Sequence, residues 1–274
     1  MKTILAAATV VALSLAPAAA RAGDLPIQDN SFLLEEAYNQ EPGVIQHISF
    51  FQRDRASGDW TYAYTEEWPA LGQAHQLSIT LPLQRSNSLP ERNTGIGDVA
   101  LNYRWQAIGS GETAVAVSPR LSLLLPTGDW KRGFGSGKPG AQVNLPVSSM
   151  LGSYFVTHTN IGATWVPSAK TVDGEGDSVT MNLGQSLIWL VHRNVNFMFE
   201  AAYTFGEQML PSGTLAQQSL FLSPGVRGAI DLPVWLGVQA VPGVAMPIGV
   251  GPSSGERGFI AYLSFEHAIT KNPW

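Results

Sequence analysis

Polar and apolar residues alternate along much of the chain, most clearly in the stretch GIGDVALNYRWQ at residues 95–106. Its apolar members fall on one parity: Val99, Leu101, Tyr103 and Trp105. Its polar members fall on the other: Asp98, Asn102, Arg104 and Gln106. A period of two is typical of a strand with one apolar and one polar face. The apolar face can contact a soluble core or lipid, so this strand alone leaves both a β-sandwich and a membrane barrel open.

The same alternation recurs down the chain and predicts about twelve strands. It is clearest over four ranges: 76–84, 115–125, 196–205 and 259–266. No helical periodicity of useful length competes with it after residue 42. The fold class is therefore expected to be all-β, apart from the N-terminal region.

The connections between these strands alternate in length from residue 85 onward. The short ones lie at 107–112, 150–153, 191–194 and 229–233. The long ones lie at 85–95, 126–140, 167–178, 206–216 and 247–258. Outer-membrane barrels have short periplasmic turns and long outer loops, whereas a sandwich has no reason to sort its loops by length. The sequence therefore predicts a transmembrane antiparallel β-barrel of about twelve strands.

The placement of tryptophan favours the same architecture. Trp105, Trp189 and Trp235 all lie next to short connections. Aromatic residues gather in a girdle where a barrel wall meets the membrane–water interface. Packing in a soluble hydrophobic core is the alternative explanation of these tryptophans.

The composition excludes several classes of protein. Only 14% of residues are charged, well below the roughly 25% usual for soluble domains. The chain contains no cysteine, which removes disulfides, thiolate catalysis and cysteine-ligated metals. A net charge of −5 with no basic run argues against nucleic acid as a partner.

The N-terminus has the features of an export signal. Residues 1–22 combine Lys2, a short apolar stretch and an A-x-A site at residues 20–22, which predicts a signal peptide. Residues 23–42 then form an N-terminal periplasmic segment before a barrel over residues 43–274. Helix-capping residues at 29–31, followed by acidic residues, predict a short helix there.

A helix of about two turns is not stable alone, so it must dock. It can dock on the periplasmic rim or enter the lumen as a plug. An unstructured leader without a role is the alternative for this segment.

Four prolines fall inside proposed strands, where a missing N–H interrupts the hydrogen-bond ladder. They are Pro119, Pro146, Pro224 and Pro242. Bulges, or kinked strands that open a gap in the wall, would both accommodate them.

Three phrases carry a resemblance to a known family: residues 29–47, 95–106 and 118–137. With them, most of the chain after the signal resembles the outer-membrane β-barrels catalogued as meta-pathway phenol-degradation or transporter-like proteins. The resemblance implies passage of small, often aromatic or hydrophobic, compounds across the outer membrane of a Gram-negative bacterium. It carries no catalytic motif.

Charged and polar residues on the inward parities are the candidate lining of a solute path. They are Asp98, Asn102, Arg104, Arg120, Glu200, Arg227 and Glu266. Arg104 and Arg120 flank a short connection, so both are expected to project into one water-filled space. Side chains in a lumen set its bore and its electric field. The alternative is that these charges cross-link the interior of a closed structural barrel, since about twelve strands leave only a narrow bore.

Other chemistry finds little support. The glycine-rich stretch 132–139 lacks the spacing of a phosphate loop and continues with Pro139. The acidic stretch 173–177 lacks the full calcium-loop pattern. A barrel enzyme acting on lipid would need a serine and a histidine on the lipid face, and His158 with Asn160 fits a polar lumen better. We therefore expect a channel or transporter with no enzymatic activity, no metal and no cofactor, whose partners are outer-membrane lipid and a small solute.

Overall fold

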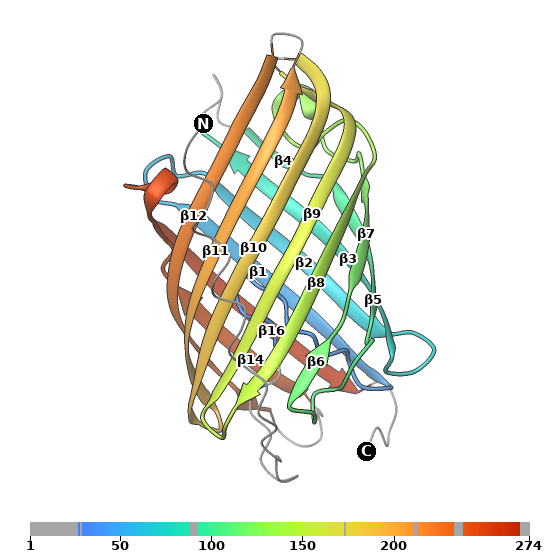
Figure 1. Ribbon diagram of the computed structural model, residues 1–274, viewed down its shortest axis with the longest axis vertical. Coiled ribbons are helices and arrows are strands. Elements are labelled where there is room, and N and C mark those ends of the chain that lie inside the picture. The colour runs from blue at the N-terminus through green and yellow to red at the C-terminus, as the bar shows by residue number, and fades with distance from the viewer. Residues whose placement is uncertain are drawn as a thin grey trace, which may run out of the picture.

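A computed structural model describes residues 27, 29–87, 93–172, 174–210, 213–232 and 238–268. The expected signal peptide at residues 1–22 and Trp235 lie outside these residues. Among the described residues, no helix has the length and apolar character needed to cross a membrane. Figure 1 shows the strands wrapping around one tall barrel.

The wall of the barrel consists of twelve antiparallel strands, as the sequence predicts. In chain order, the strands and short strand pieces are β1 (Val44–Asp54), β2 (Trp60–Pro69), β3 (His75–Ser86), β4 (Asn93–Ile96), β5 (Val99–Trp105), β6 (Val115–Val117), β7 (Arg120–Leu125), β8 (Gly140–Leu151), β9 (Phe155–Thr171), β10 (Gly174–His192), β11 (Val195–Leu210), β12 (Gly213–Gly228), β13 (Ile230–Asp231), β14 (Val238–Ala245), β15 (Ile248–Gly249) and β16 (Gly258–Ala268). The short pieces β4, β6, β13 and β15 pair with β3, β8, β14 and β12. Pairing of β1 with β16 and of β12 with β14 closes the ring.

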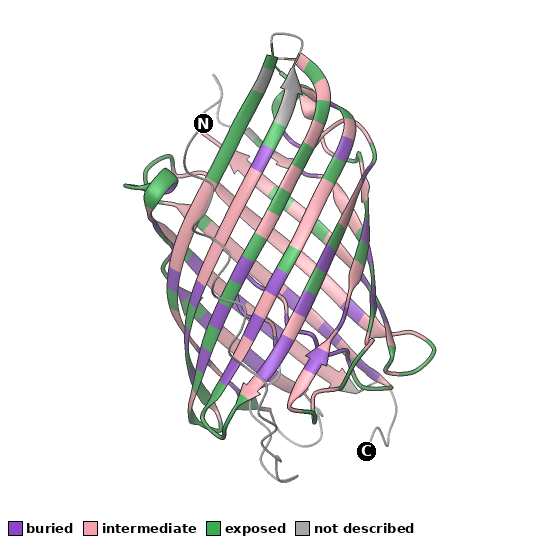
Figure 2. Ribbon diagram, in the orientation of Figure 1, coloured by how far each residue is buried: buried purple, intermediate pink, exposed green. Residues whose placement is uncertain are grey.

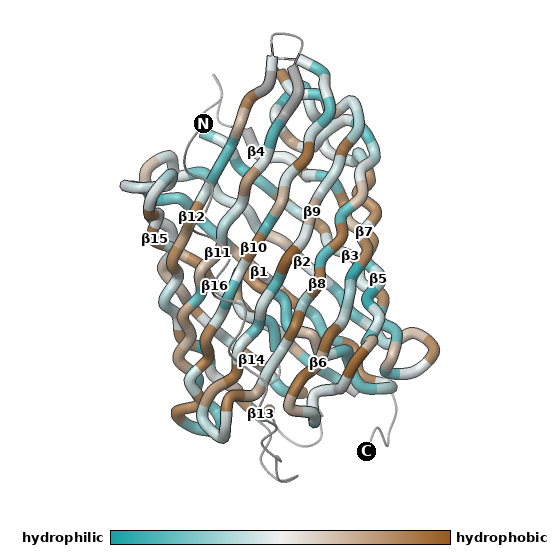
Figure 3. The backbone as a smooth tube through the Cα atoms, in the orientation of Figure 1, coloured by the Kyte–Doolittle hydropathy of each residue, from teal (hydrophilic) through white to brown (hydrophobic). Residues whose placement is uncertain are grey.

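The two faces of the wall differ as the alternation predicts. Leu101 is 42% exposed on the outer face, whereas its neighbour Asn102 is 6% exposed and points inward. Figure 2 shows buried and exposed positions alternating along β8, β9 and β10, and Figure 3 shows the matching change in hydropathy. Apolar side chains cover the outer face of the wall, as they do on the lipid-facing surface of a membrane barrel.

Aromatic residues lie on the outer face near the short turns. Trp105 ends β5, and Trp189 lies near the end of β10 between the rings of Phe155 and Phe197. The ring centroids of these two pairs are 6.5 Å and 6.1 Å apart. This placement agrees with the expected girdle at the end of the barrel that carries the short turns.

Two connections that the sequence assigns to long loops are mostly strand. Residues 167–178 and 206–216 extend the β9–β10 and β11–β12 hairpins instead. Glu175 and Asp177 are both exposed on β10. Strand extensions that leave the apolar zone can carry polar side chains on their outer face too, so the alternation that marks a strand in the wall is lost there.

Of the four prolines, only Pro119 lies at a break between strands, and the other three lie within strands whose pairing continues without a register shift. Pro119 separates β6 from β7, which makes a break between two short strands. Pro146 lies in β8, and its carbonyl accepts a hydrogen bond from the N–H of Ser118 at 3.1 Å. Pro224 and Pro242 lie in β12 and β14, which pair in register at just three positions in the described part of the chain.

Candidate functional site in the barrel lumen

Residues 29–43, here called the lumenal segment, contain no helix, and residues 29–40 are buried or half-buried inside the barrel. Several of their backbone N–H groups donate to inward-facing side chains of the wall instead. The pairs are Leu33 with Glu200 Oε1 at 2.8 Å, Glu35 with Asn160 Oδ1 at 2.9 Å, Ala37 with Ser148 Oγ at 2.7 Å and Asn39 with Gln106 Oε1 at 2.9 Å. The prediction of a short helix is therefore wrong. Wall side chains supply the acceptors that a helix would have taken from its own carbonyl groups.

Two arginines of the wall bind the carbonyl groups of the segment. Arg227 donates to the carbonyl oxygens of Asp29 and Asn30 at 2.6 and 2.9 Å, and to that of Ile27, which precedes the segment, at 2.9 Å. Arg104 donates to the carbonyl oxygens of Glu36 and Tyr38 and to Oδ1 of Asn39. Hydrogen bonds from a charged donor are roughly twice as strong as neutral ones. Both guanidinium groups therefore hold the lumenal segment.

Glycines of the wall form notches for two apolar side chains of the segment. A Cβ atom on Gly184 of β10 would lie 2.0 Å from Leu34 Cδ2. A Cβ atom on Gly243 of β14 would lie 2.5 Å from the ring of Phe32, and one on Gly225 of β12 would lie 2.7 Å from it. Sequence reasoning missed these glycines, although glycine inside a strand often marks a close approach by another backbone or a ligand.

The segment also brings carboxyl groups into the interior. Asp29 is fully buried and accepts hydrogen bonds from Ser264 Oγ at 2.5 Å and Tyr262 OH at 2.6 Å. Burial raises the pKa of Glu36 well above its ordinary value of 4.5, and nearby Asp29 raises this pKa further. The positive charges of Arg104 and Arg227 lower the pKa of Glu36, by less than burial raises it.

The structure brings together six of the seven residues that the sequence assigns to the lumen. The six on inward-facing positions are Asn102, Arg104, Arg120, Glu200, Arg227 and Glu266. Asp98 lies apart from them, between β4 and β5, where it accepts hydrogen bonds from the N–H groups of Gly128 and Ser136 at 3.0 and 2.7 Å. Asp98 thus anchors the loop at 126–139. Whether any of the seven contacts a solute stays a prediction.

His158 is a buried side chain of the wall, next to the part of the lumenal segment that contains Ala37 and Tyr38. Its Nδ1 atom is 2.7 Å from Ser148 Oγ, the atom that accepts from the N–H of Ala37. The ring of Tyr38 meets that of His158 edge-on at 6.1 Å. This serine–histidine pair therefore faces the interior rather than lipid, and it positions the acceptor for Ala37.

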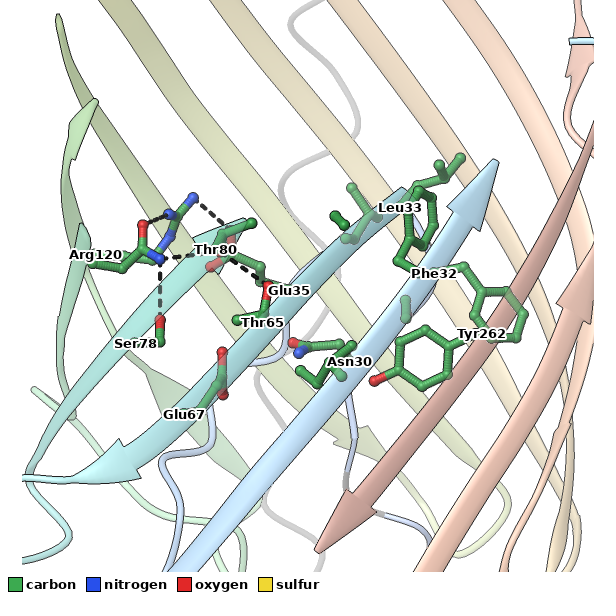
Figure 4. A pocket seen from close by; sticks show the side chains of 16 residues that line it. Asn30, Phe32, Leu33, Glu35, Thr65, Glu67, Ser78, Thr80, Arg120 and Tyr262 are labelled. Carbon is green, nitrogen blue, oxygen red and sulfur yellow. Dashed lines mark hydrogen bonds and ion pairs between the residues drawn. The ribbon is translucent and has the colours of Figure 1, made fainter. Parts of the chain in front are cut away.

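A cavity of about 220 Å³ lies between the segment and the wall. Figure 4 shows Arg120 and Ser78 on one side of it and Phe32 and Tyr262 on the other. Thr65, Glu67, Thr80 and Asn102 also give the cavity polar surface, and Ile48, Phe50 and Ala63 also give it apolar surface. The cavity is therefore amphipathic, and it fits a small molecule that carries a polar group on an apolar body.

The loop at 126–139 connects β7 to β8 at the end of the barrel opposite the short turns. Its Phe134 is 1% exposed and packs so closely on Gly95 that a Cβ there would lie 2.5 Å from the ring. A second cavity of about 350 Å³ lies beside it, lined by Trp60, Arg85 and Phe134 among others. The glycine-rich stretch 132–139 thus shapes a loop at the barrel end.

No known protein family and no curated protein matches this chain. Solved structures do. The COG4313 outer membrane channel from Pseudomonas putida F1 is 14% identical, with a TM-score of 0.62, over 84% of this chain and 97% of that one. The transport unit of the autotransporter AIDA-I from Escherichia coli is also 14% identical, with a TM-score of 0.50, over 87% and 94%. The chain therefore has the fold of a Gram-negative outer-membrane β-barrel, and its apolar outer face suits that bilayer.

Proposed function

We propose that this protein is an outer-membrane channel for small solutes, and that the lumenal segment closes it at rest. One observation carries the proposal: side chains of the wall bind the backbone of this segment by hydrogen bonds. Water can satisfy the polar groups that loss of these hydrogen bonds would expose. Release also exposes Phe32 and Leu34, which pack against the wall, so their apolar burial favours the closed state at rest.

The cavity beside the segment supports a solute with an apolar body. Phe32, Phe50 and Tyr262 contribute apolar or aromatic surface to it. Small-molecule sites are typically lined by such side chains with a few placed polar groups. The resemblance to the meta-pathway phenol-degradation barrels points to the same class of compound, small aromatic or hydrophobic molecules.

An engineered disulfide between the segment and the wall, which a reductant can break, tests the proposal. The chain has no native cysteine, so Ala37→Cys with Ser148→Cys introduces one pair of thiols at a contact where N and Oγ are 2.7 Å apart. A disulfide requires Cβ atoms about 3.5–4.5 Å apart, which a contact this close permits. Single-channel conductance in planar bilayers is the readout.

We expect the oxidised double variant to stay closed and the reduced one to open intermittently, each time the segment leaves its docked position. Ser148→Cys alone is the matched control, because it loses the same acceptor but cannot form the bridge. It should conduct whether or not a reductant is present. Equal conductance of the double variant in both redox states would contradict closure by the segment, and no conductance in either state would favour a closed structural barrel.

A further inference from the structure

Arg120 is the lumenal arginine whose contacts a solute could replace. Arg104 and Arg227 bind backbone carbonyl groups of the lumenal segment. Arg120 instead binds a carboxylate of the segment: its Nη2 atom is 2.7 Å from Glu35 Oε1. A carboxylate is a group that a small solute can also carry, so a solute can take the place of Glu35 at Arg120.

The other partners of Arg120 are neutral and belong to the wall. Its Nη1 atom donates to Asn102 Oδ1 at 2.8 Å and to Ser122 Oγ at 2.5 Å, and its Nη2 atom donates to Gln142 Oε1 at 2.7 Å. These contacts fix the direction of the guanidinium group without neutralising its charge. The charge is met by Glu35, which belongs to the lumenal segment, and both side chains of the ion pair keep some exposure, 15% for Arg120 and 29% for Glu35.

The same arginine lines the amphipathic cavity. Arg120 and Glu35 both lie at its polar side, and the rings of Phe32 and Tyr262 lie at the other (Figure 4). The rings are themselves in contact, with centroids 5.4 Å apart. The cavity measures about 220 Å³, and an apolar cavity of about 150 Å³ already holds benzene.

We infer that this cavity binds a small solute that carries a carboxylate on an apolar body, and that the solute carboxylate displaces Glu35 from Arg120. The inference rests on the proposed closure by the lumenal segment, and it names the solute class and the contact of the segment that the solute replaces. At Arg120 one carboxylate replaces another, so the exchange there is nearly balanced. Contact of the apolar body with the rings favours the solute.

Displacement of Glu35 removes one of the bonds that hold the segment. A ligand that binds better when Glu35 is free of Arg120 shifts the population toward that state by its difference in affinity for the two states. Phe32 belongs to the segment and lines the cavity, so the solute binds while the remaining hydrogen bonds to the wall keep the segment docked.

Binding of benzoate to the purified full-length protein in detergent, measured by calorimetry, tests the inference. Benzamide keeps the ring without the charge, and acetate keeps the charge without the ring. We expect benzoate to bind more tightly than either. Glu35→Gln removes the competing charge from the segment and leaves the wall intact. The affinity of this variant for benzoate should therefore be at least roughly 10-fold higher than that of the unmodified protein. Glu175→Gln, which alters an ion pair with Lys138 away from the cavity, is the matched control and should bind as the unmodified protein does.

Arg120→Gln should weaken benzoate binding by at least roughly 10-fold. Arg85→Gln, in the second cavity, should not weaken it. Heat-dependent mobility on gels establishes that each variant is folded, and Glu35→Gln alone decides the matter if Arg120→Gln does not fold. The inference is overturned if benzamide binds as tightly as benzoate or if Glu35→Gln binds benzoate no more tightly than the unmodified protein. Binding is measured without transport, so either result leaves the disulfide test of closure unaffected.

Discussion

Gly184→Ala should displace the lumenal segment while leaving the wall in place. The new methyl carbon would lie 2.0 Å from Leu34 Cδ2 and 3.1 Å from Leu34 Cδ1 and Cγ, and the three nearest atoms all belong to Leu34. Carbon atoms in contact lie about 3.5–4.0 Å apart, so the leucine must move by roughly 1.5 Å. Leu34 is only 6% exposed in its notch, so that movement disturbs its packing.

The expected cost follows from the effect of overpacking a close-fitting site. Added methyl groups in such sites cost roughly 1–3 kcal/mol. Because the clash exists only while the segment is docked, the cost falls on the closed state. The ratio of open to closed channels should therefore rise about 5- to 140-fold, at 1.4 kcal/mol per factor of ten.

Open probability in planar bilayers at a fixed voltage measures this effect. Gly228→Ala is the control, because the nearest atom to its new methyl group is Asn194 O at 3.4 Å, an ordinary contact. Combining Gly184→Ala with Leu34→Ala removes the clashing atoms, so the double variant should close better than the sum of the two single effects predicts. Unchanged open probability in Gly184→Ala, or strictly additive effects in the double variant, would refute docking of Leu34 at Gly184.

Two further predictions concern the wall and the buried acid of the segment. Leu101→Arg should lower the free energy of unfolding in lipid by about 2–4 kcal/mol because it places a charge on the lipid face. A spin label on Leu101→Cys should be accessible to oxygen dissolved in lipid, whereas one on Asn102→Cys should not; similar accessibility at both sites would contradict the assigned faces. Raising the pH should increase open probability, because the raised pKa of Glu36 makes its contribution to docking fully present below its ordinary value of 4.5 and lost as the pH rises through the docked value. Glu36→Gln should flatten this dependence, and an unchanged pH profile in that variant would show that another group is responsible.

The sequence by itself determined the barrel. In GIGDVALNYRWQ the alternation correctly assigns Leu101 to the outer face and Asn102 to the inner one, because adjacent side chains of a strand must point to opposite faces. The sorting of connections by length gave the membrane architecture even though two of the five long connections proved to be strand. Both signals are local or periodic, so they can be read from one chain.

Only the tertiary structure decided what the N-terminal segment does. Its sequence favours a short helix, but Leu33 binds Glu200, 167 residues away, and Glu35 binds Asn160, 125 residues away. No local pattern encodes acceptors so distant. The same holds for the notch at Gly184 and for the pairing of Arg120 with Glu35. Closing the barrel brings these side chains around the segment, and a backbone supplied with partners from the wall no longer needs the hydrogen bonds of a helix.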